Sequence, residues 1–247
     1  MIDNNINIKT NAGIMDSYIC YPNTSKSLPS IIFYMDAPAI RQELRDMCKK
    51  IAEEGYIVLL PNLFYRHGKE GKYPFDQNNY KDKDELKKMI TTMNSTTNKM
   101  ITEDTEFIIN YINKIKNAQK NKIGIVGYCM SGRFVVTCGA KYNDQIQAVA
   151  SFYGVGIYTE EEDSPHLYAS KIKGETYLAF AEKDIWVTNE QIKRINETFS
   201  KVNDKVTIEI YKNTEHGFAF PDRFSYNERA ASKHWKELLE LFHRNLK

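Results

Sequence analysis

Short, nearly continuous apolar runs separated by amphipathic helix patterns are the feature of this sequence that most constrains its fold. The runs "SIIFYM" (30–35) and "YIVLLP" (56–61) are typical of strands buried on both faces. Between them, residues 41–55 place apolar side chains on one helical face and end at a glycine, which is a helix stop signal. A buried strand, a helix and another buried strand predict a parallel sheet.

The same alternation continues to the end of the chain. Strands are predicted at "IGIVGY", "IQAVASFYG", "ETYLAFAE" and "VTIEIY". Helices are predicted from about residue 130, over 189–200, and in the closing stretch "NERAASKHWKELLELFHRNL". The expected fold class is therefore α/β, a doubly wound and mostly parallel sheet with helices on both faces and no large lid domain.

Three further segments complete the expected organisation. Residues 14–21 alternate like an early antiparallel strand, residues 64–79 have the composition of a long surface loop, and residues 94–117 form a strong helix pattern. The chain contains no internal repeat and no linker-like stretch. We therefore expect one domain over residues 1–247.

Composition excludes several classes of function. Hydrophobic residues make up 42% and charged residues 27% of the 247 residues, as in a globular protein with a sizeable core. The net charge of +2 is too small for a dedicated nucleic-acid binder. Because no apolar run approaches membrane-spanning length and the N-terminal stretch has no signal-peptide core, we expect a cytoplasmic protein that does not contact membranes.

The four cysteines show no paired motif and no metal-like spacing with histidine, which favours reduced thiols over disulfides or a metal site. They are Cys20, Cys48, Cys129 and Cys138. No glycine-rich phosphate loop follows a predicted strand. We expect no metal and no cofactor.

The stretch "GYCMS" (127–131) lies where a strand should give way to a helix, and it matches the spacing of the nucleophile elbow G-x-S-x-G. Cys129 takes the nucleophile's position, at a helix N-terminus that favours thiolate. The N–H of Met130 would then point toward a tetrahedral oxyanion. Spacing alone leaves a buried, inert thiol equally open.

Two other predicted strands end in residues that complete a catalytic set. Asp184 follows "ETYLAFAE", where an α/β hydrolase places the acid that orients its histidine, although a turn aspartate is the simpler interpretation taken alone. Glu182 is a weaker candidate because it belongs to the strand end. His216 follows the last strand, in a loop punctuated by glycine and proline. Cys129, Asp184 and His216 follow one another in the order nucleophile, acid, histidine. Together they indicate a catalytic set more strongly than any one of them does alone.

With these motifs, the sequence resembles the dienelactone hydrolase family of α/β hydrolases, from "PSIIFYMDAP" and "GYIVLLPNLFYR" through "VGYCMSGR" to "EHGFAFPDR". The resemblance implies that Cys129 is the nucleophile, His216 the general base and then acid, and Asp184 the orienting residue. The sequence departs from the family pattern at Ser131, where the family normally has the first of two paired glycines.

The resemblance also implies accessory residues. Asp36 stands where the family has an acidic residue, usually glutamate, that contacts the resting cysteine; a turn aspartate ahead of Pro38 is the alternative. The N–H of Ala37 matches the second oxyanion donor. Tyr153 and Phe218 could line the pocket, although aromatic residues at strand ends more often pack in the core.

Arg66 matches an arginine that binds the substrate carboxylate in the dienelactone enzymes, and an exposed loop arginine is the alternative. The second such arginine is absent, because Phe220 stands in its place and Arg223 lies further along. The dienelactone substrate itself is therefore not implied.

The functional hypothesis is hydrolysis of a small ester or lactone through a thioester on the cysteine. Two alternatives remain open: an acyl-transferase or thioesterase on the same fold, and a degenerate homologue that binds ligands without catalysis. The expected partner is a small-molecule ester or lactone, and the chain could be a monomer or a homodimer.

Overall fold

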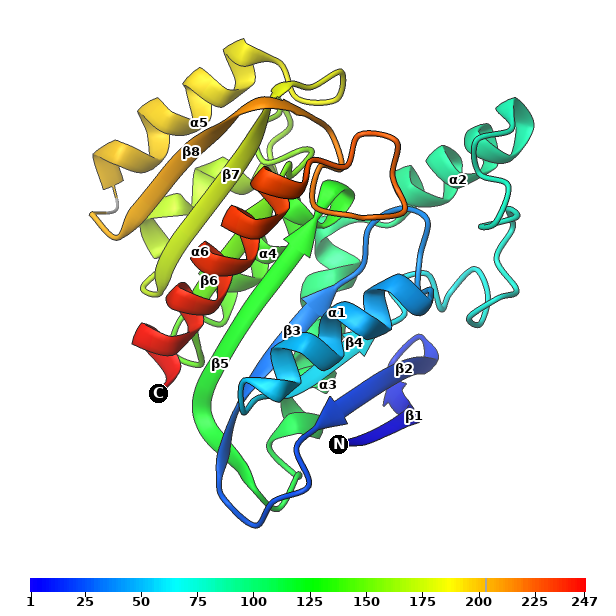
Figure 1. Cartoon of the computed structure of the whole chain (residues 1–247), viewed down its shortest axis with the longest axis vertical. Helices are drawn as coiled ribbons and strands as arrows, with labels where there is room; N and C mark the ends of the chain where they lie inside the picture. Colours follow the sequence, from blue (N-terminus) through cyan, green and yellow to red (C-terminus); the bar gives the residue numbers. More distant parts are fainter. Residues whose placement is uncertain (203) are drawn as a thin grey trace. The chain divides into compact units, whose positions relative to one another are not determined.

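The structure is a computed structural model that describes residues 1–202 and 204–247 (Figure 1). The chain divides into two units, residues 1–120 and residues 121–247. Each unit has its own strands and its own covering helices.

The strands of the first unit are β1 (Ile2–Thr10), β2 (Gly13–Tyr21), β3 (Leu28–Tyr34) and β4 (Ile57–Pro61), in the order β1-β2-β4-β3. Strand β2 is antiparallel to both neighbours, as predicted, and β3 pairs with β4 in parallel. Both β3 and β4 are buried throughout, which confirms the interpretation of their apolar runs.

Strand β1 was not predicted, because its few apolar residues are interspersed with asparagines, which are poor strand formers. Its inward side chains become more buried toward the hairpin, where Ile8 and Thr10 are covered. Pairing with β2 over the whole strand therefore outweighs local propensity.

The helices of the first unit are α1 (Gln42–Glu53), α2 (Lys83–Ser95) and α3 (Asn98–Ile112). Helix α1 buries the predicted apolar face, which includes Leu44 and Ile51. The helix predicted over 94–117 is shorter than expected because Thr97 caps α3, where its side chain accepts a hydrogen bond from the N–H of Met100 at 3.2 Å. The predicted loop lies within 62–82, the longest described stretch without helix or strand.

The strands of the second unit are β5 (Ala118–Tyr128), β6 (Ile146–Phe152), β7 (Glu175–Lys183) and β8 (Val206–Glu215). They are neighbours in that order and all parallel. Between and after them come the 3-10 turn η1 (Cys129–Ser131), which leads into α4 (Gly132–Lys141), then η2 (Pro165–Lys171), α5 (Asn189–Val202) and α6 (Glu228–Leu246). Helix α6 crosses one face of these strands, and α4 lies on the other (Figure 1).

The parallel strands of the second unit bring their following residues to one edge of the sheet. Cys129, Asp184 and His216 are each the first residue after β5, β7 and β8, respectively, and Tyr153 is the first after β6. This edge, at the carboxyl ends of the strands, is where α/β proteins place their ligands. In the part of the chain that the structure describes, none of the helices has the length and apolarity required of a membrane span.

Candidate active site

The turn that carries Cys129 is sharp and strained. Cys129 has a φ of +54°, in the left-handed region that non-glycine residues rarely occupy. A Cβ added to Gly127 would lie 2.7 Å from the carbonyl oxygen of Ser131, and one added to Gly132 would lie 2.2 Å from the Cα of Gly154. The corner therefore requires glycine on both sides, and the predicted strand-to-helix turn is confirmed.

Cys129 differs from the other cysteines in its accessibility. Its residue is partly exposed, whereas Cys20, Cys48 and Cys138 are buried. Burial raises the pKa of Cys20 to about 12 and raises that of Cys48 well above its ordinary value. These two thiols stay protonated at neutral pH. Cys129 is thus the best-placed thiol for attack on a ligand.

The backbone around Cys129 is fixed. The N–H of Val155 donates to the carbonyl oxygen of Cys129 at 2.8 Å, and the N–H of Gly132 donates to the same oxygen. Met130 is buried in the 3-10 turn η1 that leads into α4, and N–H groups at the start of a helix have no acceptor within it. Its N–H belongs to the group of donors that can stabilise an anion.

His216 and Asp184 lie side by side. The Nδ1 of His216 donates to Oδ2 of Asp184 at 2.8 Å, and the side chain of Asp184 is completely buried. The other oxygen, Oδ1, accepts hydrogen bonds from the N–H groups of Trp186 at 2.8 Å and Val187 at 3.3 Å. Asp184 is therefore both a turn aspartate and a partner of the histidine, because one oxygen accepts the N–H groups of the turn and the other binds the imidazole.

The remaining nitrogen of His216 points away from this carboxylate. Nε2 is buried and has no partner of regular hydrogen-bond geometry among the described residues. Burial alone would lower the pKa of His216, but the charge of Cys129, together with the hydrogen bond to Asp184, raises it to about 10. The imidazole can therefore hold a proton at neutral pH when Cys129 is a thiolate.

The aromatic side chains near His216 form a support behind it. Tyr153 meets the imidazole edge to face, with ring centroids 5.0 Å apart, and Phe218 packs against Tyr153 at 5.1 Å. Both side chains are fully buried. In this structure they hold the histidine in place, and neither presents a surface to an open pocket.

Glu182 is engaged elsewhere. It lies within β7, as expected, and accepts hydrogen bonds from Nζ of Lys212 at 2.9 Å and from the N–H of Asn213 at 2.8 Å. Its carboxylate therefore serves the pairing of β7 with the end of β8.

One contact behind the elbow was not predicted. Tyr128, directly before Cys129, shares a buried hydrogen bond of 2.7 Å with Nε2 of His234. His234 lies on the inner face of α6, 106 positions along the chain. The helical pattern of α6 indicates that His234 faces inward, but no local signal connects it with Tyr128.

Asp36, in the first unit, is paired with an arginine. Nη1 and Nη2 of Arg41 lie 2.6 and 3.3 Å from its two carboxylate oxygens, and the residue is almost fully buried. Its carbonyl oxygen also accepts the N–H of Ala39, so Asp36 is a turn residue as well. The roles predicted for Asp36 and for the neighbouring Ala37 N–H remain predictions.

Arg66 is held by a carboxylate of the protein itself. Its Nη1 and Nη2 donate to the two oxygens of the buried Asp104, at 2.5 and 3.0 Å, and the hydroxyl of Tyr65 donates to the same group at 2.8 Å. A substrate carboxylate would have to compete with Asp104 for this fork. This pairing counts against the predicted role of Arg66.

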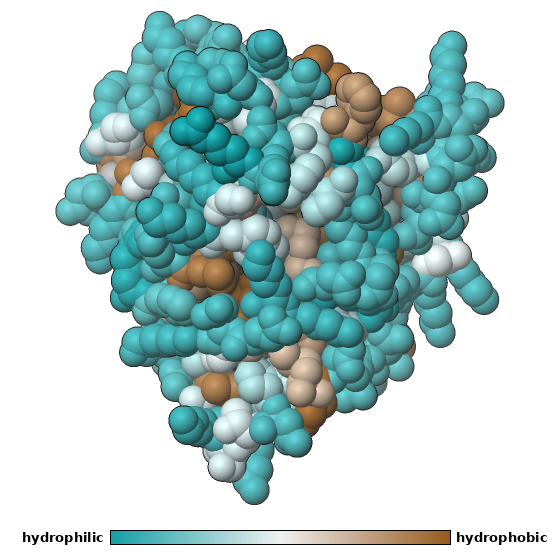
Figure 2. Space-filling view, viewed as in Figure 1, coloured by the Kyte–Doolittle hydropathy of each residue, from teal (hydrophilic) through white to brown (hydrophobic). Residues whose placement is uncertain are grey.

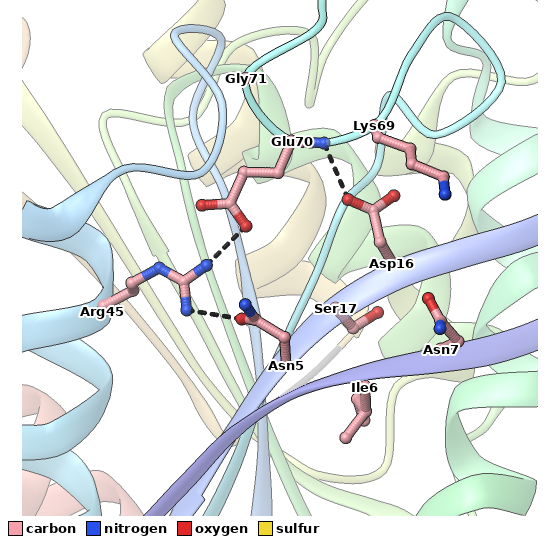
Figure 3. A pocket seen from close by; sticks show the side chains of 9 residues that line it. All are labelled: Asn5, Ile6, Asn7, Asp16, Ser17, Arg45, Lys69, Glu70 and Gly71. Carbon is pink, nitrogen blue, oxygen red and sulfur yellow. Dashed lines mark hydrogen bonds and ion pairs between the residues drawn. The ribbon is translucent and has the colours of Figure 1, made fainter.

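The first unit also contains a hollow of about 460 Å³ between β1, β2 and the segment 69–71 (Figure 3). Two of its carboxylates are engaged within the protein: Glu70 pairs with Arg45 at 2.5 Å, and Asp16 accepts the N–H of Glu70 at 2.8 Å. None of the predicted site residues lines it. Among the residues that the structure describes, no group of three or more His, Cys, Asp or Glu side chains could hold a metal ion.

Comparison with known proteins decides the family. The sequence model of the Dienelactone hydrolase family matches residues 15–246. The chain belongs to the dienelactone hydrolase family. As a member of this family it is a hydrolase that acts on carboxylic esters or lactones.

Two relatives align with this chain over nearly the whole length of both proteins. A protein of Synechocystis sp. named carboxymethylenebutenolidase is 27% identical over 233 residues, which cover 93% of this chain and 92% of the relative. A dienelactone hydrolase structure from Klebsiella pneumoniae superposes with a TM-score of 0.85, at 22% identity and 98% coverage of both chains.

An acylaminoacyl peptidase from Pyrococcus horikoshii shares the fold over all of this chain but only 42% of its own length, with a TM-score of 0.72 and 18% identity. These structural similarities establish the α/β-hydrolase fold.

Proposed function

We propose that this hydrolase cleaves a small ester or lactone through a thioester intermediate on Cys129. The contact set of His216 is the observation that carries the proposal. One imidazole nitrogen donates to the buried Asp184, and the charge of Cys129 acts on the same ring and raises its pKa to about 10. Nucleophile, base and orienting acid thus follow three parallel strands that end at one edge.

In the proposed first step, His216 takes the proton of the Cys129 thiol, and the thiolate attacks the carbonyl carbon. The oxyanion is stabilised by the N–H of Met130 and, by the family resemblance, by that of Ala37, each donor contributing roughly 3 kcal/mol. His216 then gives its proton to the leaving alkoxide, and the thioester remains.

In the second step, His216 removes a proton from water, which attacks the thioester and releases the acid. Acid–base catalysis of this kind contributes about two to four decades in rate. Because thiolate leaves a tetrahedral intermediate more easily than alkoxide does, the enzyme needs an ester with a good leaving group, such as an enol ester or lactone.

The remaining expectations enter as parts of the same proposal. We infer that Asp36 is the accessory acidic residue of the family pattern and that Tyr153 and Phe218 position the histidine. We also infer that residues 1–247 form one catalytic domain, an interpretation supported by a family match that runs from residue 15 to residue 246. A cytoplasmic location is supported by the cysteines, because Cys20, Cys48, Cys129 and Cys138 are all outside disulfide bonds.

The test is Cys129→Ala, assayed on aryl esters and unsaturated lactones, with Cys138→Ala as the matched control. We expect Cys129→Ala to abolish turnover and Cys138→Ala to keep it. Full turnover in Cys129→Ala would exclude the covalent route.

A labelling experiment provides an independent measurement. Brief treatment with iodoacetamide should modify Cys129 faster than the three buried cysteines, because only Cys129 is partly exposed. Equal labelling rates would show that Cys129 is not activated.

A further inference from the structure

Four large apolar side chains are exposed on the two loops that carry Asp184 and His216. The loop after β7 exposes 88% of Ile185 and 41% of Trp186, and the loop after β8 exposes 99% of Phe224 and 40% of Tyr226. Figure 2 shows apolar surface at the upper edge of the molecule, where Figure 1 draws the loop between β7 and α5. We call these four residues the apolar rim.

The loop after β7 is fixed to the candidate catalytic pair. Ile185 directly follows Asp184, and the N–H of Trp186 donates to Oδ1 of Asp184. The Trp186 ring lies 6.4 Å from the His216 ring, measured between centroids. A ligand carbon chain that leaves His216 on this side would meet an indole and an isoleucine.

The loop after β8 is fixed to the same histidine from its other end. Ser225, next to Phe224, donates its hydroxyl to the carbonyl oxygen of His216 at 2.6 Å. Apart from His216, which is paired with Asp184, the charged residues of this loop are Asp222 and Arg223, whose charges are opposite. The loop therefore offers apolar surface without a net charge.

The arginine that the family resemblance assigns to a substrate carboxylate is also occupied. Both terminal nitrogens of Arg66 are bonded to Asp104, so its charge is balanced within the protein. Exposed apolar side chains that gather on the loops of a candidate catalytic pair are typical of a ligand-binding surface.

We propose that the apolar rim binds the hydrocarbon part of the substrate, and that the substrate is a neutral ester with an aliphatic or aryl chain. This inference rests on the proposed ester hydrolysis at Cys129. Ile185 and Phe224, the most exposed members, determine the preference for chain length. A small anionic lactone would leave the rim uncovered.

The experiment measures kcat/KM for p-nitrophenyl esters from acetate to octanoate, all below their critical micelle concentrations, together with the anionic p-nitrophenyl hemisuccinate. Because each methylene buried against the rim favours binding in the transition state, kcat/KM should rise about tenfold or more from acetate to octanoate. The hemisuccinate should be no better than the neutral butyrate of equal length.

Two variants test whether the apolar rim causes the preference for long ester chains. Ile185→Ser and Phe224→Ser should each lower the octanoate-to-acetate ratio of kcat/KM by about threefold to tenfold. Val202→Ser is the matched control, because Val202 is also exposed (45%) but lies at the opposite end of α5, and its ratio should equal that of the wild type.

The outcomes separate this inference from the proposed function. A flat chain-length series, a preference for the hemisuccinate, or equal losses on acetate and octanoate in both rim variants would overturn the inference while Cys129-dependent hydrolysis stands. Hydrolysis that survives Cys129→Ala would instead overturn the proposed function.

Discussion

The two units of the chain use buried aspartates in different ways. In the first unit, Asp36 pairs with Arg41 and Asp104 with Arg66, each through two guanidinium nitrogens. In the second unit, the buried Asp184 pairs with His216. Arginine keeps its charge at every pH that a folded protein experiences, whereas imidazole gains and loses a proton near neutrality.

This difference separates structural pairs from a pair that can move a proton. An Asp–Arg pair fixes two loops or elements and cannot change its charge state. An Asp–His pair also joins a carboxylate to a cationic side chain, but the imidazolium can pass its proton on to a third group. In this chain that third group is Cys129, whose charge acts on the same ring.

The largest contrast is expected between Asp184→Asn and Asp104→Asn. In Asp184→Asn the new amide oxygen can still accept the N–H groups of the turn, but the negative charge is lost, so we expect kcat to fall about 10²- to 10⁴-fold with little change in stability. Asp104→Asn leaves Arg66 without a counter-charge, so the free energy of unfolding should fall by about 2–3 kcal/mol, discounted for the partial exposure of Arg66.

Steady-state kinetics and urea unfolding measure the two quantities in parallel. Asp104→Asn should change kcat less than about threefold. If both variants lost activity by the same factor while folded, the distinction between structural and proton-moving pairs would be wrong.

The second contrast concerns pH. Since the charge of Cys129 is a major cause of the raised pKa of His216, Cys129→Ala should lower that pKa from about 10 toward its ordinary value of 6.5. A proton NMR titration of the His216 imidazole in the wild type and in Cys129→Ala measures the change. A His216 pKa near 6.5 in the wild type would contradict the account.

The same shift predicts a pH dependence of stability. The pKa of His216 is higher in the folded than in the unfolded chain, so its contribution is fully present below pH 6.5 and is lost as the pH rises toward 10. In Cys129→Ala this loss should shrink. The Asp–Arg pairs contribute no change in that interval, because neither partner titrates there.

The smallest effect is expected at Ser131, where the sequence departs from the family pattern. Ser131 has a φ of −82°, which any residue can adopt, and the close contact of the corner falls on Gly132 instead. Ser131→Gly should therefore change kcat less than about threefold and lower stability by less than about 1 kcal/mol.

Gly132→Ala provides the comparison, because its added methyl group would overlap Gly154 and should cost about 1–3 kcal/mol or more. A tenfold gain of activity in Ser131→Gly would show that the serine distorts the turn.

Much of the second unit could be predicted from the sequence, for a physical reason. Buried parallel strands need continuous apolar runs, and such runs place Cys129, Asp184 and His216 at strand ends without further information. The order of these residues along the chain then indicates their joint role.

The pairs in the first unit could not be predicted in the same way. Arg41 and Asp104 look like ordinary helix residues in the text of the sequence, and their partners become visible only when side chains meet in space. The same holds for Tyr128 and His234, and for β1, whose stability comes from its neighbour β2. Local patterns predict elements, but long-range side-chain pairing needs coordinates.

The most direct test of the central claim is mass spectrometry of the wild-type enzyme, acid-quenched during turnover of a p-nitrophenyl ester. The account predicts an added acyl mass on the peptide that contains Cys129, held on sulfur as a hydroxylamine-labile thioester and absent from Cys129→Ala. Steady turnover with the acyl group on Ser131, or an adduct that persists in Cys129→Ala, would contradict it.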